Sequence, residues 1–161
     1  MHEERPVLLI EHEHEDAMTF RRILGLAVSP SGLVHAQDKE GALLYLQERA
    51  IKPQLIIMNV DAPQMTAVSF LRILKQDPVF KSIPVVALAG QRCVDTINSS
   101  FSMGIAGYMV KDEDPSQFTT KLAVIIDYWG LNRLPLMELL HKAAGCESAT
   151  PSAVVPRDAM F

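Results

Sequence analysis

Histidine and acidic side chains are concentrated in one short segment near the start of the chain, Glu11 to Asp16, where His12 and His14 alternate with glutamates. Imidazole and carboxylate groups together suit Zn²⁺, and an imidazole titrates near neutral pH. Neighbouring loop residues converge poorly on one ion, however, and this spacing matches no metal motif. We therefore expect no metal site. We interpret the segment as a solvated loop leading into a helix, whose dipole favours acids in its first turn.

The other polar residues that could do chemistry are isolated from one another in the sequence. Asn59 and Asp61 follow the apolar run Leu55 to Met58, and Lys111 follows the run Gly107 to Val110. No Ser-His-Asp set, glycine-rich phosphate loop or Cys₂His₂ spacing accompanies them. We therefore expect a protein that is not an enzyme and that carries no cofactor.

The composition is that of one globular domain with a sizeable core, because 161 residues contain 48% hydrophobic and 21% charged side chains. The net charge is −4 and no run of Lys or Arg exceeds two, which argues against nucleic acid or a membrane as a partner. The acidic start lacks the features of a signal peptide, and no apolar run is long enough to span a bilayer. Cys93 and Cys146 fit a reducing cytoplasm, although a disulfide between them stays open.

Strand-like and helix-like segments alternate along the chain. The strands are nearly continuous apolar runs, which indicates a parallel sheet covered by helices on both faces. Five such units predict an α/β doubly wound five-stranded parallel sheet with strand order 2-1-3-4-5. We expect strands at 7–10, 33–36, 55–58, 84–89 and 107–110, and helices at 15–27, 39–49, 65–75, from 94 to about 101, and from Pro115 onward.

In a doubly wound fold the functional residues lie at the carboxyl ends of the strands, near the point where the strand order reverses. Four segments should meet there: Glu11 to Glu15, Asn59 to Asp61, Ala89 with Gly90, and Lys111. The sequence thus predicts one pocket built from residues far apart in the chain.

This residue set resembles the receiver domain of two-component response regulators. Five motifs in the right order carry the resemblance, which covers roughly residues 6 to 128: Leu8 to Asp16, Ala36 to Leu43, Pro53 to Asn59 with Pro63 and Met65, Ile83 to Val86, and Gly104 with Gly107 to Lys111. The resemblance implies a flavodoxin-like, CheY-like fold. It also implies a role in phosphorelay signal transduction.

A second resemblance concerns the segment Tyr128 to Pro135, which is similar to the arm of single-domain regulators associated with bacterial phytochromes. In that group the arm extends the last helix and supports a homodimer. The last helix shows two apolar stripes, of which Phe118, Leu122, Ile125 and Trp129 should face the sheet. The second stripe predicts a dimer or partner interface made of Val124, Tyr128, Leu131 and Leu134. We expect a receiver-like domain at 1–128, an arm or short helix at 129–145 and a flexible tail at 146–161.

The chain departs from the receiver pattern at most of the positions that carry the family's chemistry. The resemblance implies Mg²⁺ held by two acids after the first strand and by an acceptor aspartate after the third. It further implies a hydroxyl after the fourth strand and a lysine after the fifth, both contacting phosphate. The corresponding residues here are Glu11, His12, Asn59, Ala89 and Lys111. An amide cannot take up a phosphoryl group, and only Glu11 and Lys111 keep their chemical types.

The changes at these positions reduce the negative charge of the pocket. Three carboxylates would supply −3 where Glu11 supplies −1, and a neutral imidazole is a poor Mg²⁺ ligand. We expect Glu11 and Lys111 to pair and leave the pocket near neutral without a metal. Two interpretations remain for Tyr108, which stands at the family's switch aromatic. It is an amphipathic ring at a helix–sheet edge, or it belongs to a switch or partner surface.

The sequence therefore predicts an atypical single-domain regulator, a pseudo-receiver that signals by phosphorylation-independent protein–protein interaction as a homodimer in the cytoplasm. Expected partners are a second copy, a sensor kinase, a phytochrome-like sensor or another regulator protein. The alternative is a regulator that senses a ligand, a metal or pH through the altered pocket around His12. A conventional phosphorelay regulator is the third hypothesis.

Overall fold

The structure is a computed structural model, and it describes residues 5–27, 32–61, 64–90, 94–111 and 114–131. Its centre is a five-stranded sheet in the order β2-β1-β3-β4-β5, in which all neighbouring strands are parallel. The predicted strand order is thereby confirmed. The strands are β1 (Val7–Ile10), β2 (Leu33–Ala36), β3 (Leu55–Asn59), β4 (Val85–Ala89) and β5 (Gly107–Val110).

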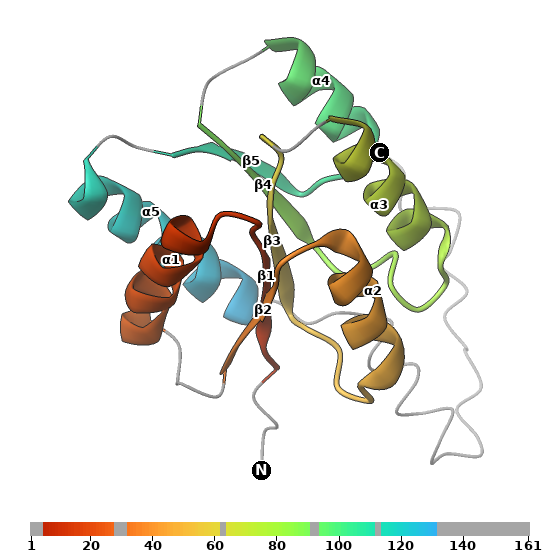
Figure 1. Cartoon of the computed structure of the whole chain (residues 1–161), viewed down its shortest axis with the longest axis horizontal. Coiled ribbons are helices and arrows are strands. Elements are labelled where there is room, and N and C mark those ends of the chain that lie inside the picture. Colours follow the sequence, from red (N-terminus) through yellow and green to blue (C-terminus); the bar gives the residue numbers. More distant parts are fainter. Residues whose placement is uncertain (1–4, 28–31, 62–63, 91–93, 112–113, 132–161) are drawn as a thin grey trace, which may run out of the picture.

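In the described part of the chain, five helices connect and cover the strands (Figure 1). They are α1 (His14–Ala27), α2 (Lys39–Glu48), α3 (Gln64–Gln76), α4 (Val94–Ser102) and α5 (Pro115–Leu131). Local sequence sets several of the helix starts. Asp38 caps α2, because its side chain accepts the Gly41 N–H at 2.7 Å. Asp114 precedes the first-turn proline of α5 and accepts the Ser116 N–H at 2.9 Å.

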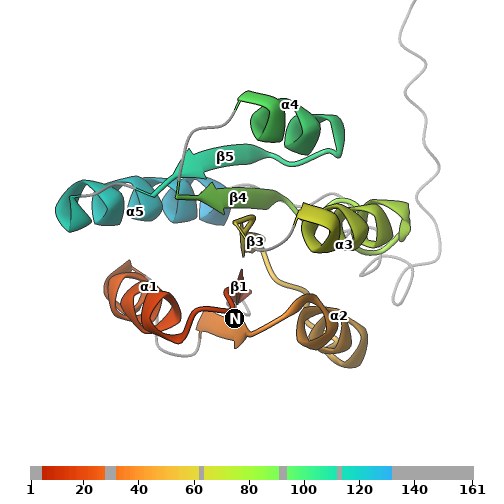
Figure 2. The same cartoon turned by 45° about the horizontal axis from the view of Figure 1, so that its top comes forward.

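The sheet is buried on both faces, so its core has two parts (Figure 2). Alternate residues of each strand point to opposite faces. Leu8 and Ile10 of β1 therefore belong to a core shared with α2 and α3, whereas Val7 and Leu9 belong to a core shared with α1 and α5. Phe20 of α1 fills the second core and meets Phe118 of α5 edge-on, with ring centroids 5.4 Å apart. Burial on both faces explains why the strands read as continuous apolar runs.

Helix α5 turns a slightly different face to the sheet from the one predicted. Phe118, Leu122 and Ile126 are buried, whereas Ile125 and Trp129 are only partly buried beside them. The sequence pattern placed Ile125, rather than its neighbour Ile126, against the sheet. Adjacent residues lie next to each other around a helix, so a small difference in the rotation of the helix exchanges them. Val124 and Tyr128 are exposed, as the second stripe requires, at 61% and 59%. The side chain of Leu131 and all of Leu134 lie outside the described residues.

The predicted arm and tail lie almost wholly outside the part of the chain that the structure describes. Helix α5 continues through residues 129–131, so the described end of the chain is helical. The remaining segments, 132–145 and 146–161, stay predictions. Within the described residues, no helix has both the length and the apolar character needed to cross a membrane.

Candidate functional site: a receiver pocket with an amide at its centre

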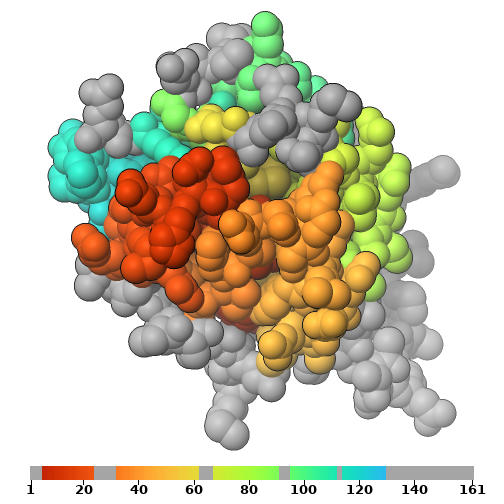
Figure 3. All heavy atoms as spheres, in the orientation of Figure 1, coloured from red at the N-terminus to blue at the C-terminus, as the bar shows by residue number. Residues whose placement is uncertain are grey.

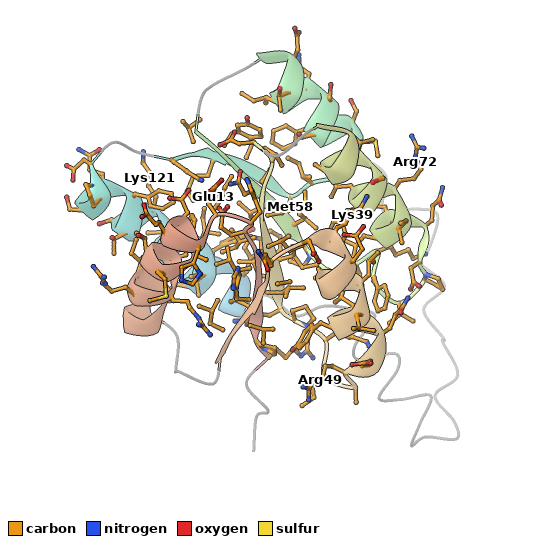
Figure 4. The ribbon with its side chains drawn as sticks, viewed as in Figure 1. Glu13, Lys39, Arg49, Met58, Arg72 and Lys121 are labelled. Atoms are coloured by element: carbon orange, nitrogen blue, oxygen red, sulfur yellow. The ribbon has the colours of Figure 1, made fainter. Side chains whose placement is uncertain are left out.

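The fold brings the predicted pocket residues together at the carboxyl edge of the sheet. Glu11 follows β1, Asn59 ends β3, Ala89 ends β4 and Lys111 follows β5. Figure 4 marks this region with the labels Glu13, Met58 and Lys39, which come from the segment after β1, from β3 and from the start of α2. The positions agree with the sequence prediction. The contacts between the side chains differ from it in two respects.

The centre of the pocket is a direct contact between Asn59 and Glu11. Asn59 Nδ2 donates to both Glu11 carboxylate oxygens, Oε1 and Oε2, at 2.9 Å each. Asn59 Oδ1 accepts the Asp61 N–H at 2.8 Å, which fixes the orientation of the amide. Glu11 is 1% exposed and Asn59 7%, so the pair is shielded from water. Because hydrogen bonds to a charged, buried group are strong, the amide holds the carboxylate firmly.

This geometry does not fit the Mg²⁺ that the receiver fold implies. Such an ion requires several hard oxygen ligands around one position. Here the Asn59 amide hydrogens bond both oxygens of Glu11, and the Glu13 N–H donates to Oε1 as well at 3.1 Å. Across the described residues, no group of three or more His, Cys, Asp and Glu side chains is placed to hold a metal ion.

Lys111 has a different principal partner from the one predicted. Its Nζ donates to Asp16 Oδ2 at 2.7 Å, whereas Glu11 Oε2 is 3.6 Å away. Burial lowers the pKa of Lys111, but the hydrogen bond to Asp16 and the charges of Glu11, Asp16 and Asp61 raise it, and the net result is a raised pKa. Lys111 does pair with Glu11, as expected, but Asp16 is its nearer partner, and the charges of Asp16 and Asp61 act on the lysine as well.

Sequence reasoning missed the roles of Asp16 and His35. Asp16 was interpreted as one of several solvated acids, but it lies in the first turn of α1 and accepts from Lys111. His35 of β2 has Nε2 2.8 Å from the backbone oxygen of Glu11 and so helps to position that residue. The cluster of acids was a visible signal for Asp16. Nothing in the sequence singled out His35.

His12, the residue at the lost acid's position, lies at the open side of the pocket. Its Nδ1 is 3.5 Å from Glu11 Oε1, its Nε2 is 3.3 Å from Glu13 Oε1, and its side chain is 45% exposed. It also lines a hollow of about 260 Å³ between α2 and α3. Figure 3 shows the face on which the orange atoms of α2 and the yellow-green atoms of α3 lie side by side. The walls of the hollow also include Ile10, Gln37, Asp38, Lys39, Glu40, Met58, Asn59, Ala67 and Phe70.

The remaining predicted positions lie at the ends of β4 and β5. Ala89 is buried, at 2% exposure, and offers no hydroxyl group. The next residue, Gly90, donates its N–H to Asp61 Oδ2 at 2.7 Å. Tyr108 is partly buried against the core shared with α2 and α3. Its packing is compatible with the amphipathic-ring interpretation, and a partner surface at Tyr108 stays a prediction.

The strand order and the place of this pocket at the carboxyl edge of the sheet are those of a receiver domain. The chain belongs to the response regulator receiver domain family, whose model matches residues 7–123. Proteins of this family act in two-component signalling. The curated response regulator Rcp1 of Synechocystis is 24% identical over 128 residues, which cover 76% of this chain and 87% of that protein.

Solved structures agree with this assignment. The phosphorylated cyanobacterial phytochrome response regulator RcpA matches with a TM-score of 0.73 and 26% identity, over 83% of this chain and 99% of that one. A response regulator in red light signalling of R. palustris matches with a TM-score of 0.72 and 22% identity, over 81% and 98% of the two chains. At this lower identity the second likeness supports the fold alone. The predicted resemblance to phytochrome-associated regulators is confirmed.

Proposed function

We propose that this protein is a pseudo-receiver, a single-domain regulator that signals by binding other proteins without accepting phosphate. The observation that carries the proposal is the pair of hydrogen bonds from the Asn59 amide to both oxygens of Glu11. The amide stands where a phosphate-accepting receiver carries its aspartate, and it occupies the carboxylate that would otherwise bind a cation. The similar regulator RcpA is described as phosphorylated. The Rcp1 structure, 23% identical with a TM-score of 0.69, is described as Mn²⁺-bound. The present pocket keeps Glu11 and Lys111 but has an amide at the acceptor position and no hydroxyl at position 89.

Incubation with acetyl phosphate and Mg²⁺ tests this proposal directly. We expect no phosphoryl adduct in the intact mass spectrum, because no carboxylate stands at position 59 and no hydroxyl stands at position 89. RcpA, treated in the same buffer, serves as the positive control. Stoichiometric phosphorylation of the present chain would overturn the proposal and favour a conventional phosphorelay regulator.

The same proposal includes a homodimer formed through α5. Val124 and Tyr128 lie one turn apart on that helix and are largely exposed. The Tyr128 ring meets Trp129 edge-on, with centroids 5.1 Å apart, so that the exposed surface continues into the partly buried aromatic ring. Neighbouring exposed apolar side chains on the outer face of a helix favour a partner surface when they form a contiguous patch. Leu131 and Leu134 would extend it. The further partners we propose are a sensor kinase, a phytochrome-like sensor or another regulator, in the cytoplasm.

The hollow beside His12 favours one alternative, a regulator that senses a ligand, a metal or pH. An open hollow of about 260 Å³ with an imidazole at its rim and both apolar and charged lining residues offers space for a small ligand. If this alternative holds, dimerisation should change with pH or with added Zn²⁺, and His12→Ala should abolish that change. His14→Ala is the matched control, because His14 belongs to the same segment and is exposed. Dimerisation that responds identically in wild type and His12→Ala would exclude His12 as the sensor.

A further inference from the structure

A series of hydrogen bonds connects the buried centre of the pocket with the segment after β4. Glu11 accepts both amide hydrogens of Asn59, and Asn59 Oδ1 accepts the Asp61 N–H at 2.8 Å. The Asp61 carboxylate then accepts the Gly90 N–H at 2.7 Å. Each residue in the series orients the next one. Asp61 is exposed, but its backbone is held by a buried side chain, so its carboxylate has a defined direction.

We infer that the Asp61 carboxylate is a built-in anion that joins the segment after β3 to the segment after β4. It accepts the backbone N–H directly after Ala89, and its charge acts on Lys111, the lysine to which the receiver resemblance assigns a phosphate contact. The inference rests on the proposed function and deepens it. A receiver whose two segments are joined by its own carboxylate has no need of an added phosphoryl group for that connection.

Charge and space at the contact both support this role. A backbone N–H that donates to a carboxylate makes a charge-assisted hydrogen bond, which is shorter and stronger than a neutral one. Lys111 interacts electrostatically with Asp61 as well. Position 90 suits the contact because it carries no side chain. A Cβ atom at Gly90 would lie 3.1 Å from Asp61 Oδ2, so any larger residue would crowd the carboxylate.

Amide hydrogen exchange of the full ¹⁵N-labelled chain tests the contact. We expect Asp61→Ala to speed exchange at the Gly90 amide roughly tenfold, the change expected when one hydrogen bond is lost. Asp61→Asn keeps the size and an acceptor oxygen but loses the charge, and should give a smaller increase. Gly90→Ala, which crowds the carboxylate, should also speed exchange at position 90. In the Asp61→Ala background, that second change should add little, since the two residues act through one contact.

Two further measurements separate this role from a general loosening of the fold. Glu48→Gln removes an exposed acid on α2 with no neighbour in the pocket, and it should leave exchange at Gly90 unchanged. The pKa of Lys111, followed by NMR of its side chain, should fall in Asp61→Ala and in Asp61→Asn, because one of the charges that raise it is removed. Unchanged exchange at Gly90 in both Asp61 variants, or an equal increase in Glu48→Gln, would overturn the inference.

Failure of this inference is distinguishable from failure of the proposed function. The exchange experiment contains no phosphate donor, so it reports on the Asp61–Gly90 contact alone. Phosphorylation by acetyl phosphate with an intact contact would refute the pseudo-receiver and leave the contact in place. If the chain is not phosphorylated and exchange at Gly90 is unaltered in the Asp61 variants, the inference about Asp61 is refuted and the pseudo-receiver proposal stands.

Discussion

Replacing Asn59 with aspartate should destabilise this protein rather than repair it. The change removes both hydrogen bonds to Glu11 and places two carboxylates face to face in a site shielded from water. Breaking buried, charge-assisted contacts of this kind costs about 3 kcal/mol. For a chain of this size, that corresponds to a melting temperature lower by roughly 10 °C. Thermal unfolding followed by circular dichroism measures the difference.

The matched control is Asn98→Asp, the same chemical change at an exposed position of α4. We expect it to shift stability by less than about 0.5 kcal/mol. Added Mg²⁺ should restore part of the stability of Asn59→Asp and leave the wild type unaffected, because only the variant offers paired carboxylates. An Asn59→Asp protein as stable as the wild type would contradict our description of the pocket. So would efficient phosphorylation of that variant, since His12 and Ala89 remain in place.

The second large effect is expected in Tyr128→Glu, which should convert the proposed dimer to monomer. Aromatic residues at the centre of an interface typically contribute 2 kcal/mol or more, so the dissociation constant should rise by roughly thirtyfold or more. A buried, unpaired carboxylate would add to that loss. Sedimentation velocity over a range of protein concentrations measures the change directly.

Leu44→Glu is the control for a general effect of placing a charge on an exposed apolar position. Leu44 is 54% exposed and lies on α2, which covers the opposite face of the sheet from α5. The Leu44→Glu variant should leave the dissociation constant of the dimer unchanged. Two results would show that α5 does not form a dimer interface. One is a wild-type protein that sediments as a monomer at all concentrations, and the other is a Tyr128→Glu variant that dimerises as well as the wild type.

The fold could be predicted from the sequence because its main determinants are local. Apolar runs such as Leu55 to Met58 and Val85 to Ala89 can be explained only by burial on both faces. Their order along the chain then leaves few possible arrangements. The predicted meeting of Glu11, Asn59, Ala89 and Lys111 followed from that topology alone. Which of them touch could not be derived in the same way.

Side-chain contacts in the pocket depend on directions that no sequence pattern encodes. Lys111 lies closer to Asp16 than to Glu11, because the first turn of α1 brings Asp16 within 2.7 Å of Nζ. The Asp61–Gly90 contact likewise depends on how Asn59 turns the backbone after β3. Predicting whether Ile125 or Ile126 faces the sheet would require knowing the rotation of α5 about its own axis to within one residue. Each of these is a property of the assembled tertiary structure.

The bonds that hold the Glu11 carboxylate have a consequence for how such a protein could carry information. A phosphate-accepting receiver stores a message as a covalent mark, which one enzyme writes and another erases. In the proposed role, the amide at position 59 cannot take up such a mark, and it is bonded to the Glu11 carboxylate instead. What remains variable is the number of copies in the cell, since the occupancy of a dimer or a partner complex follows from mass action. In the proposed role, synthesis and degradation of the chain would replace the kinase and the phosphatase as its controls.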